Sequence, residues 1–275
     1  MKDLKKIIRG IVNFFKGCVL GLANIIPGVS GGTMAVAMDC YDEYVETLGV
    51  RKIKKNLFFL LTAGAGMLLS IWFFSMVASN LIENYAVASA LTFVGFIVGS
   101  LPLIFKHTRR AAGKFSLIHF LGFAFGLGVM VFMSTLSESS NEIVREFNMQ
   151  NFLWLTFMMT ISSFSMIIPG ISGSLIMMSL GAYSTITNSI SELNLLLIPV
   201  VLGACIGLLL GSRLMSFLLK KFGGITYSII LGLVLGSIIP IVMPLLPLSF
   251  NTEFFIGIAC LAAAGGLSYF CSKNS

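Results

Sequence analysis

Two short segments that break helices constrain this chain more than any other feature. Residues 25–32 read Ile-Ile-Pro-Gly-Val-Ser-Gly-Gly and residues 167–174 read Ile-Ile-Pro-Gly-Ile-Ser-Gly-Ser, so six of eight positions are identical at an offset of 142 residues. Proline removes a backbone donor and clashes with the preceding helical turn, whereas glycine permits tight turns. Because both copies lie inside apolar runs, each predicts a break between two helices at membrane depth. Such breaks are tolerated only where they are buried in protein or line a polar cavity.

The composition identifies the class of protein. The 275 residues are 57% hydrophobic and 11% charged, whereas soluble domains carry about 25% charged residues. The apolar runs are continuous rather than alternating, which favours helices over a transmembrane β-barrel. We therefore predict an all-α polytopic membrane protein with a single membrane domain over residues 1–275.

Six apolar runs are long enough to cross a membrane, and two hairpins surround the breaks. The six runs are residues 57–79, 86–105, 115–134, 195–219, 225–242 and 254–271. The first break separates residues 10–26 from residues 33–38, and the second separates residues 152–168 from residues 171–187. Six apolar residues rise about 9 Å, against a hydrocarbon core of about 30 Å. We therefore expect re-entrant helical hairpins, with a pair of full spans at each place as the open alternative.

The order of these segments predicts an inverted-topology repeat. Repeat one covers residues 10–135 and repeat two covers residues 152–272, each with one hairpin plus three transmembrane helices, after a basic amphipathic helix over residues 2–16. Since three spans are odd in number, the second repeat must be inserted upside down, as in inverted-repeat transporters. With the N-terminus and the C-terminus both inside, every one of the 18 Lys and Arg residues except Arg145 lies on the cytoplasmic side, as the positive-inside rule requires.

The residues around the two breaks predict an anion-binding site. The first N–H groups of a helix have no intrahelical partner and lie at the positive end of its dipole, and glycines leave these groups uncovered. Such helix starts bind phosphate in soluble proteins and anionic substrates in inverted-repeat transporters. The alternative is a pair of buried turns whose groups satisfy one another. The candidate residues are Asn24, Pro27, Gly28, Ser30, Gly31, Gly32, Thr33, Pro169, Gly170, Ser172, Gly173 and Ser174.

Three side chains outside the breaks are further candidates. Arg213 lies six residues before the end of its run, where an arginine could neutralise a phosphate or extend to the cytoplasmic surface. Tyr41 and Tyr183 correspond at the offset of 142 residues. A shared role for the two tyrosines is either closing the hairpin over a ligand or anchoring it at the interface.

An acidic face follows the first break. Asp39, Asp42, Glu43 and Glu46 have the spacing of one helix face. Asp39 is a candidate for gating or for relaying a coupling proton. The favoured interpretation of the group is a solvated face that pairs with the basic residues of segment 51–55.

The chain resembles the PopT family of polyprenyl-phosphate transporters. The resemblance rests on residues 21–33 with Tyr41, and on residues 168–174 with Gly-Ala-Tyr at 181–183. It implies a multi-pass protein of the bacterial inner membrane that returns undecaprenyl phosphate from the outer to the cytoplasmic leaflet for cell-envelope synthesis. Its implied partners are that lipid and membrane lipids, without nucleic acid. Position 24 is often acidic in this family, so Asn24 puts any proton coupling through that position in question.

The residues alone lead to an inverted-repeat transporter with a central anion site. A channel or antiporter for small inorganic anions is therefore the alternative, and assembly into a homo-oligomer is left open. A lipid phosphatase is disfavoured because neither His107 nor His119 lies in an Arg/His/Asp cluster. We accordingly expect no catalytic residues, no metal site and no cofactor.

Overall fold

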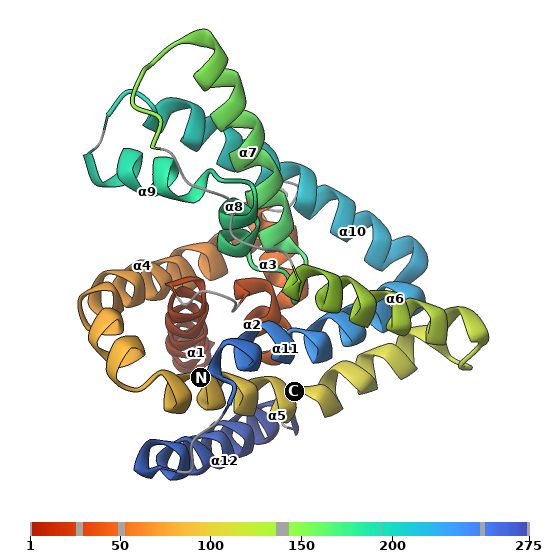
Figure 1. Ribbon diagram of the computed structural model, residues 1–275. Coiled ribbons are helices and arrows are strands. Elements are labelled where there is room, and N and C mark those ends of the chain that lie inside the picture. Colours follow the sequence, from red (N-terminus) through yellow and green to blue (C-terminus); the bar gives the residue numbers. More distant parts are fainter. Residues whose placement is uncertain are drawn as a thin grey trace.

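The computed structural model describes residues 2–25, 30–48, 53–135, 143–192, 194–247 and 251–273, and none of these residues forms a β-strand. Pro27 and Gly28 lie outside the described residues. Helices that are long and apolar enough to cross a membrane number six within the described ranges, so the chain is a multi-pass membrane protein. Figure 1 shows the helices, which are α1 (Lys2–Ile25), α2 (Gly31–Ala37), α3 (Tyr41–Leu48), α4 (Ile53–Asn84), α5 (Ala86–Ala112), α6 (Leu117–Ser134), α7 (Met149–Ile167), α8 (Gly173–Ser179), α9 (Tyr183–Glu192), α10 (Leu197–Gly236), α11 (Ile238–Val242), the 3-10 helix η1 (Met243–Leu245) and α12 (Thr252–Lys273).

Each of the six predicted spans corresponds to a helix over most of its length, although α6 begins at Leu117, α10 begins at Leu197, and the span 225–242 continues past the end of α10 into α11. Two of them, 195–219 and 225–242, share α10, which leaves helical dihedral angles at Phe222 (φ −130°, ψ 37°). There the Thr226 hydroxyl donates to the Leu218 carbonyl at 3.2 Å, although eight residues of straight helix would rise about 12 Å. The chain therefore turns back sharply, as Figure 1 shows. We call residues 197–221 α10a and residues 223–236 α10b.

The start of the chain forms one long helix. The predicted amphipathic helix over residues 2–16 continues into the apolar segment that begins at residue 10, and together they form α1, which is described as far as Ile25. The fifth span ends irregularly, as Pro240 and the prolines after it predict, because α10 stops at Gly236 and is followed by α11 and η1.

The helices on the far side of each break correspond closely. Helices α2 and α8 are both seven residues long and begin 142 residues apart, and so do α3 and α9. Between them, Asp39 has φ 51° and Gly181 has φ 71°, both left-handed. In both cases the next backbone N–H donates to a carbonyl five residues earlier at 2.9 Å, which is the Schellman ending of a helix. The predicted segment 171–187 is therefore two helices, α8 and the start of α9.

Glycines bring α1 against α4 with the backbones in contact. Gly17 lies on the backbone of Ala63, and Gly21 lies on that of Met67. Because the later residue of α1 contacts the later residue of α4, the two helices run parallel. The segment that contains α2 and α3 must therefore return the chain to the side where α1 begins. The equivalent contacts make α7 and α10a parallel, with Gly203 on Thr156, Gly207 on Thr160 and Gly211 on Phe164.

The remaining long helices pair across the two halves of the chain. Gly95 lies on Leu261 and Gly99 lies on Gly265, so α5 runs parallel to α12. Helix α10b runs parallel to α6, since Gly232 lies on Phe123 and Gly236 lies on Leu127 and Met130.

Helices α5 and α10b cross the centre in opposite directions. Gly224 lies beside Ala112, and the Thr108 hydroxyl is 3.3 Å from the Tyr227 carbonyl. Because the later residue of α10b contacts the earlier residue of α5, the two helices are antiparallel.

The core of the protein lies around the short helix α2. All seven residues of α2 are buried. They belong to one apolar cluster with side chains from α1, α5 and α10b, among them Leu20, Ile97 and Ile230. Because side chains from three other helices pack against it, α2 is held from several sides by van der Waals contacts.

Candidate functional site

The second break is a tight turn that requires its glycine. The Ile171 N–H donates to the Ile168 carbonyl at 3.3 Å, which closes a four-residue turn with Pro169 and Gly170 at its centre. Gly170 has φ 94°, as the third residue of a type II turn requires. A Cβ atom at Gly170 would also lie 2.8 Å from the backbone of Leu233. The sequence Pro-Gly is therefore dictated by both the turn and the close approach of α10b.

The structure brings the first turn of α2 against the second break. The Gly170 N–H donates to the Thr33 hydroxyl at 2.7 Å. The Tyr41 hydroxyl donates to the Ile167 carbonyl, also at 2.7 Å, and a Cβ at Gly32 would lie 3.1 Å from the Met166 carbonyl. The Gly170 amide is therefore already satisfied by the other half of the chain.

Each helix before a break covers the first glycine after it. Asn24 donates from its amide to the Leu20 carbonyl at 3.0 Å, and its side-chain oxygen lies where a Cβ of Gly31 would approach within 2.8 Å. In the second copy the side chain of Met166 contacts Gly173 in the same way. Position 24 therefore touches the helix start that the sequence predicted to bind an anion.

The hydroxyl groups at the two helix starts differ in their hydrogen bonding. Ser30 Oγ is buried, and it has no hydrogen-bond partner among the described residues. The Ser172 and Ser174 hydroxyls share a hydrogen bond of 2.8 Å. Within the described ranges, neither Ser30 nor Ser172 caps its own helix through its side chain. The first N–H groups of α2 and α8 therefore lack the usual internal cap.

The two hairpins are not equally enclosed. Every residue of α2 is buried, whereas in α8 only Gly173 is buried. Tyr41 is 4% exposed, whereas its counterpart Tyr183 is half-buried. A cavity of about 330 Å³ lies beside α8, between Leu175, Met178 and the prolines after α10. The second hairpin is therefore the more accessible of the two.

On the other side of α2, Asp39 pairs with a histidine from α5. His107 Nε2 lies 3.1 Å from Asp39 Oδ1, and the His107 ring stacks on Tyr227 with centroids 5.5 Å apart. Lys16 Nζ approaches the Asp39 carbonyl at 3.5 Å. Asp39, His107 and Tyr227, together with Asp42, border a cavity of about 90 Å³.

The surroundings shift the pKa values of the two aspartates in opposite directions. The hydrogen bond from His107 lowers the pKa of Asp39 below its ordinary 3.8, against the effect of partial burial. Burial raises the pKa of Asp42 above 3.8. Opposite shifts on neighbouring carboxyl groups are more frequent at functional sites than elsewhere on a protein.

The acidic face has partners from three helices that are distant in the sequence. Arg9 Nη2 contacts Glu43 at 2.9 Å, His107 contacts Asp39, and Lys220 Nζ lies 3.9 Å from Glu46. These partners come from α1, α5 and α10. The basic side chains of segment 51–55 lie outside the described residues, so the pairing with them stays a prediction.

Among the candidate residues that the structure describes, only Arg213 is exposed on the exterior. It is exposed on α10a between the buried residues Ser212 and Met215. Of the two roles considered for it, this position agrees with an arginine that extends to the surface.

His107 is the residue that the sequence analysis missed. It lies 68 residues from Asp39, and no motif or spacing links the two. The available signal was Asp39 itself, because its counterpart at the offset of 142 is Gly181. A carboxylate in a left-handed position that favours glycine indicates a side chain with a specific partner.

Comparison with known proteins identifies the family of this chain. The chain is 26% identical over 248 residues to a polyprenyl-phosphate transporter of Staphylococcus aureus (strain NCTC 8325 / PS 47), which covers 86% of this chain and 87% of the relative. It is also 26% identical over 252 residues to a polyprenyl-phosphate transporter of Vibrio cholerae serotype O1, with 85% and 78% covered. No solved structure matches. A family model described as undecaprenyl phosphate translocase-like matches residues 20–248, which include both breaks and the Asp39–His107 pair, and the chain belongs to this family.

Proposed function

We propose that this chain transports undecaprenyl phosphate and returns it from the outer to the cytoplasmic leaflet of the bacterial inner membrane, for reuse in cell-envelope synthesis. The observation that carries the proposal is the meeting of the two breaks, where Thr33 and Gly170 join the halves of the chain at 2.7 Å. Both curated relatives are named polyprenyl-phosphate transporters. These names do not favour a channel for small inorganic anions, and they support transport rather than catalysis.

In this proposal the phosphate binds between the two breaks. Its donors are the uncapped N–H groups at the starts of α2 and α8, with the hydroxyls of Ser30, Ser172 and Ser174. The buried, unpartnered Ser30 hydroxyl supports this, because a buried polar group without a partner costs about 1–3 kcal/mol. A phosphate oxygen would satisfy it. The isoprenoid tail stays in the lipid, and Arg213 lies outside the site.

The membrane arrangement that we propose is an inverted-topology repeat with re-entrant hairpins and both termini in the cytoplasm. The parallel pairs α1–α4 and α7–α10a support the return of each hairpin to its starting side. The antiparallel crossing of α5 and α10b, which hold equivalent places in the two halves, supports the inversion. The concentration of Lys and Arg at the predicted cytoplasmic segments supports the orientation.

The unequal enclosure of the hairpins supports a gating role for the residues beside α2. Tyr41 ties the first hairpin to the Ile167 carbonyl, and Asp39 ties it to His107. In our proposal these bonds close the site on the side of repeat one. Tyr183 would have the equivalent role in the second hairpin and would hold that hairpin closed.

The test is the pool of undecaprenyl phosphate on the outer leaflet of cells. Cells that lack this protein should accumulate the lipid there, and expression of the wild-type chain should restore the low level. Expression of Gly170→Ala at equal abundance should fail to restore it. An outer-leaflet pool that is unchanged by loss of the protein would exclude the proposed direction of transport.

A further inference from the structure

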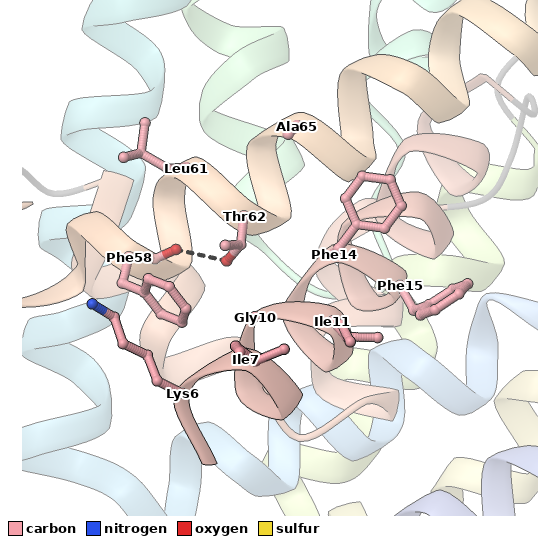
Figure 2. A pocket seen from close by; sticks show the side chains of 10 residues that line it. All are labelled: Lys6, Ile7, Gly10, Ile11, Phe14, Phe15, Phe58, Leu61, Thr62 and Ala65. Atoms are coloured by element: carbon pink, nitrogen blue, oxygen red, sulfur yellow. Dashed lines mark hydrogen bonds between the residues drawn. The ribbon is translucent and has the colours of Figure 1, made fainter. Parts of the chain in front are cut away.

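A groove of about 680 Å³ follows the seam between α1 and α4, away from the two breaks. Figure 2 shows the side chains that line it, six from α1 and four from α4. Small residues leave space at its floor, because Gly10 has no side chain and Ala65 has only a methyl group. The Thr62 hydroxyl in the groove donates to the Phe58 carbonyl at 2.6 Å, so it does not require a partner from a ligand.

The walls of the groove are apolar and uncovered by protein. Ile7, Ile11, Phe15 and Leu61 are between 51% and 63% exposed. Apolar side chains of this kind can contact a hydrocarbon chain by van der Waals packing.

One end of the groove carries a positive charge. Lys6 Nζ lies 5.7 Å from the centre of the Phe58 ring, and Figure 2 shows both at the end opposite Phe14 and Phe15. Lys6 has no carboxylate partner among the side chains that the structure describes, whereas the nearby Arg9 is paired with Glu43 at 2.9 Å. The groove therefore matches a molecule with an anionic head and an apolar tail.

The groove is a single seam that is closed at its inner end. Beyond this end the helices contact each other, because Gly66 lies on the backbone of Phe14 and Gly17 lies on that of Ala63. Polyprenyl phosphate carries a single hydrocarbon chain, which can follow this one seam.

We propose that this groove is a second binding site for polyprenyl phosphate, which holds the isoprenoid chain between α1 and α4 and the phosphate beside Lys6 at the cytoplasmic surface. The proposal rests on the proposed function and on its orientation with the N-terminus inside. Lys6 and Ile25, where α1 reaches the first break, are separated by about 28 Å of helix. A single phosphate group therefore cannot contact Lys6 and the first break at the same time. In this proposal the groove receives the lipid after its phosphate has left the site between the two breaks.

The test counts bound lipids on the purified full-length protein by native mass spectrometry, with polyprenyl phosphate or phosphatidylglycerol as the probe. Wild type should bind two copies of polyprenyl phosphate. Ala65→Leu, which fills the groove, should bind one. Gly64→Leu is the matched control, because a Cβ atom at Gly64 meets nothing within 4 Å, and it should bind two.

The charge is tested separately by Lys6→Gln and Lys6→Arg. A basic side chain near an anionic headgroup contributes about 1 kcal/mol, so Lys6→Gln should weaken binding of the second copy about fivefold and Lys6→Arg should restore it. The groove proposal is overturned if Ala65→Leu and Lys6→Gln bind as wild type does, or if phosphatidylglycerol displaces the second copy. A wild-type protein that binds no polyprenyl phosphate at all would overturn the proposed function together with the groove.

Discussion

The Thr33 hydroxyl accepts a hydrogen bond of 2.7 Å from the Gly170 amide, and the two residues are 137 positions apart in the sequence. This bond joins the helix that follows the first break to the turn that forms the second break. It therefore joins the two halves of the chain directly. Any motion that separates the halves must break this bond.

Replacement of Thr33 by Val should therefore destabilise the protein. The change keeps the shape of the side chain but leaves the buried Gly170 N–H without an acceptor, which costs about 1–3 kcal/mol. Thermal unfolding of the purified protein in detergent measures the loss. Thr92→Val is the matched control, because the Thr92 hydroxyl donates within its own helix, to Ala88, at 2.7 Å. Equal unfolding temperatures for the two variants would contradict the contact between the halves.

Gly170→Ala should be damaging for two separable reasons. The alanine would have to adopt φ 94° and would meet the Leu233 backbone at 2.8 Å. Gly113→Ala tests the backbone strain alone, because Gly113 has φ 65° and a Cβ atom there would meet no other atom within 4 Å. This strain costs about 1–2 kcal/mol. Gly128→Ala carries neither. The unfolding temperature should fall in the order Gly128→Ala, Gly113→Ala, Gly170→Ala, and any other order would show that the turn at Gly170 can relax.

A comparison of two substitutions at Asp39 should reveal the strain of its left-handed backbone conformation. Both Asp39→Gly and Asp39→Ala remove the hydrogen bond to His107, but only alanine retains a side chain at φ 51°. The glycine variant should be more stable than the alanine variant by about 1 kcal/mol. Chemical or thermal unfolding measures this difference. An alanine variant as stable as the glycine variant would mean that the left-handed conformation is not maintained.

Acid should weaken the protein partly through Asp39. Its pKa is lower in the folded protein than its ordinary value of 3.8 because His107 donates to the carboxylate. Such a group stabilises the folded state above pH 3.8, and that contribution is lost as the pH falls toward the lowered pKa. Between about pH 5 and pH 3, wild type should therefore lose stability more steeply than Asp39→Asn. Parallel pH profiles would show that the His107 pair does not contribute.

Much of this architecture could be predicted from local sequence, because helices, breaks and spans depend on neighbouring residues. The six spans, the division of 195–242 into two helices and the distortion near Pro240 followed from apolar length and proline.

Contacts between distant residues could not be predicted. The Thr33–Gly170 and Asp39–His107 bonds join segments 137 and 68 residues apart, and nothing local encodes their distance. For the same reason, the partners of the acidic face on α1, α5 and α10 were not predicted.

The most direct test of the central claim is the rate at which purified protein moves polyprenyl phosphate across the bilayer of proteoliposomes. Wild type should accelerate the movement over protein-free vesicles. Ser30→Ala combined with Ser172→Ala should slow it at least tenfold, because loss of donors to a charged phosphate costs about 1.5–3 kcal/mol each. Ser134→Ala, whose hydroxyl donates to Val131 in its own helix, should leave the rate unchanged. A rate for wild type no higher than that of empty vesicles, or a double variant as fast as wild type, would contradict phosphate binding between the two breaks.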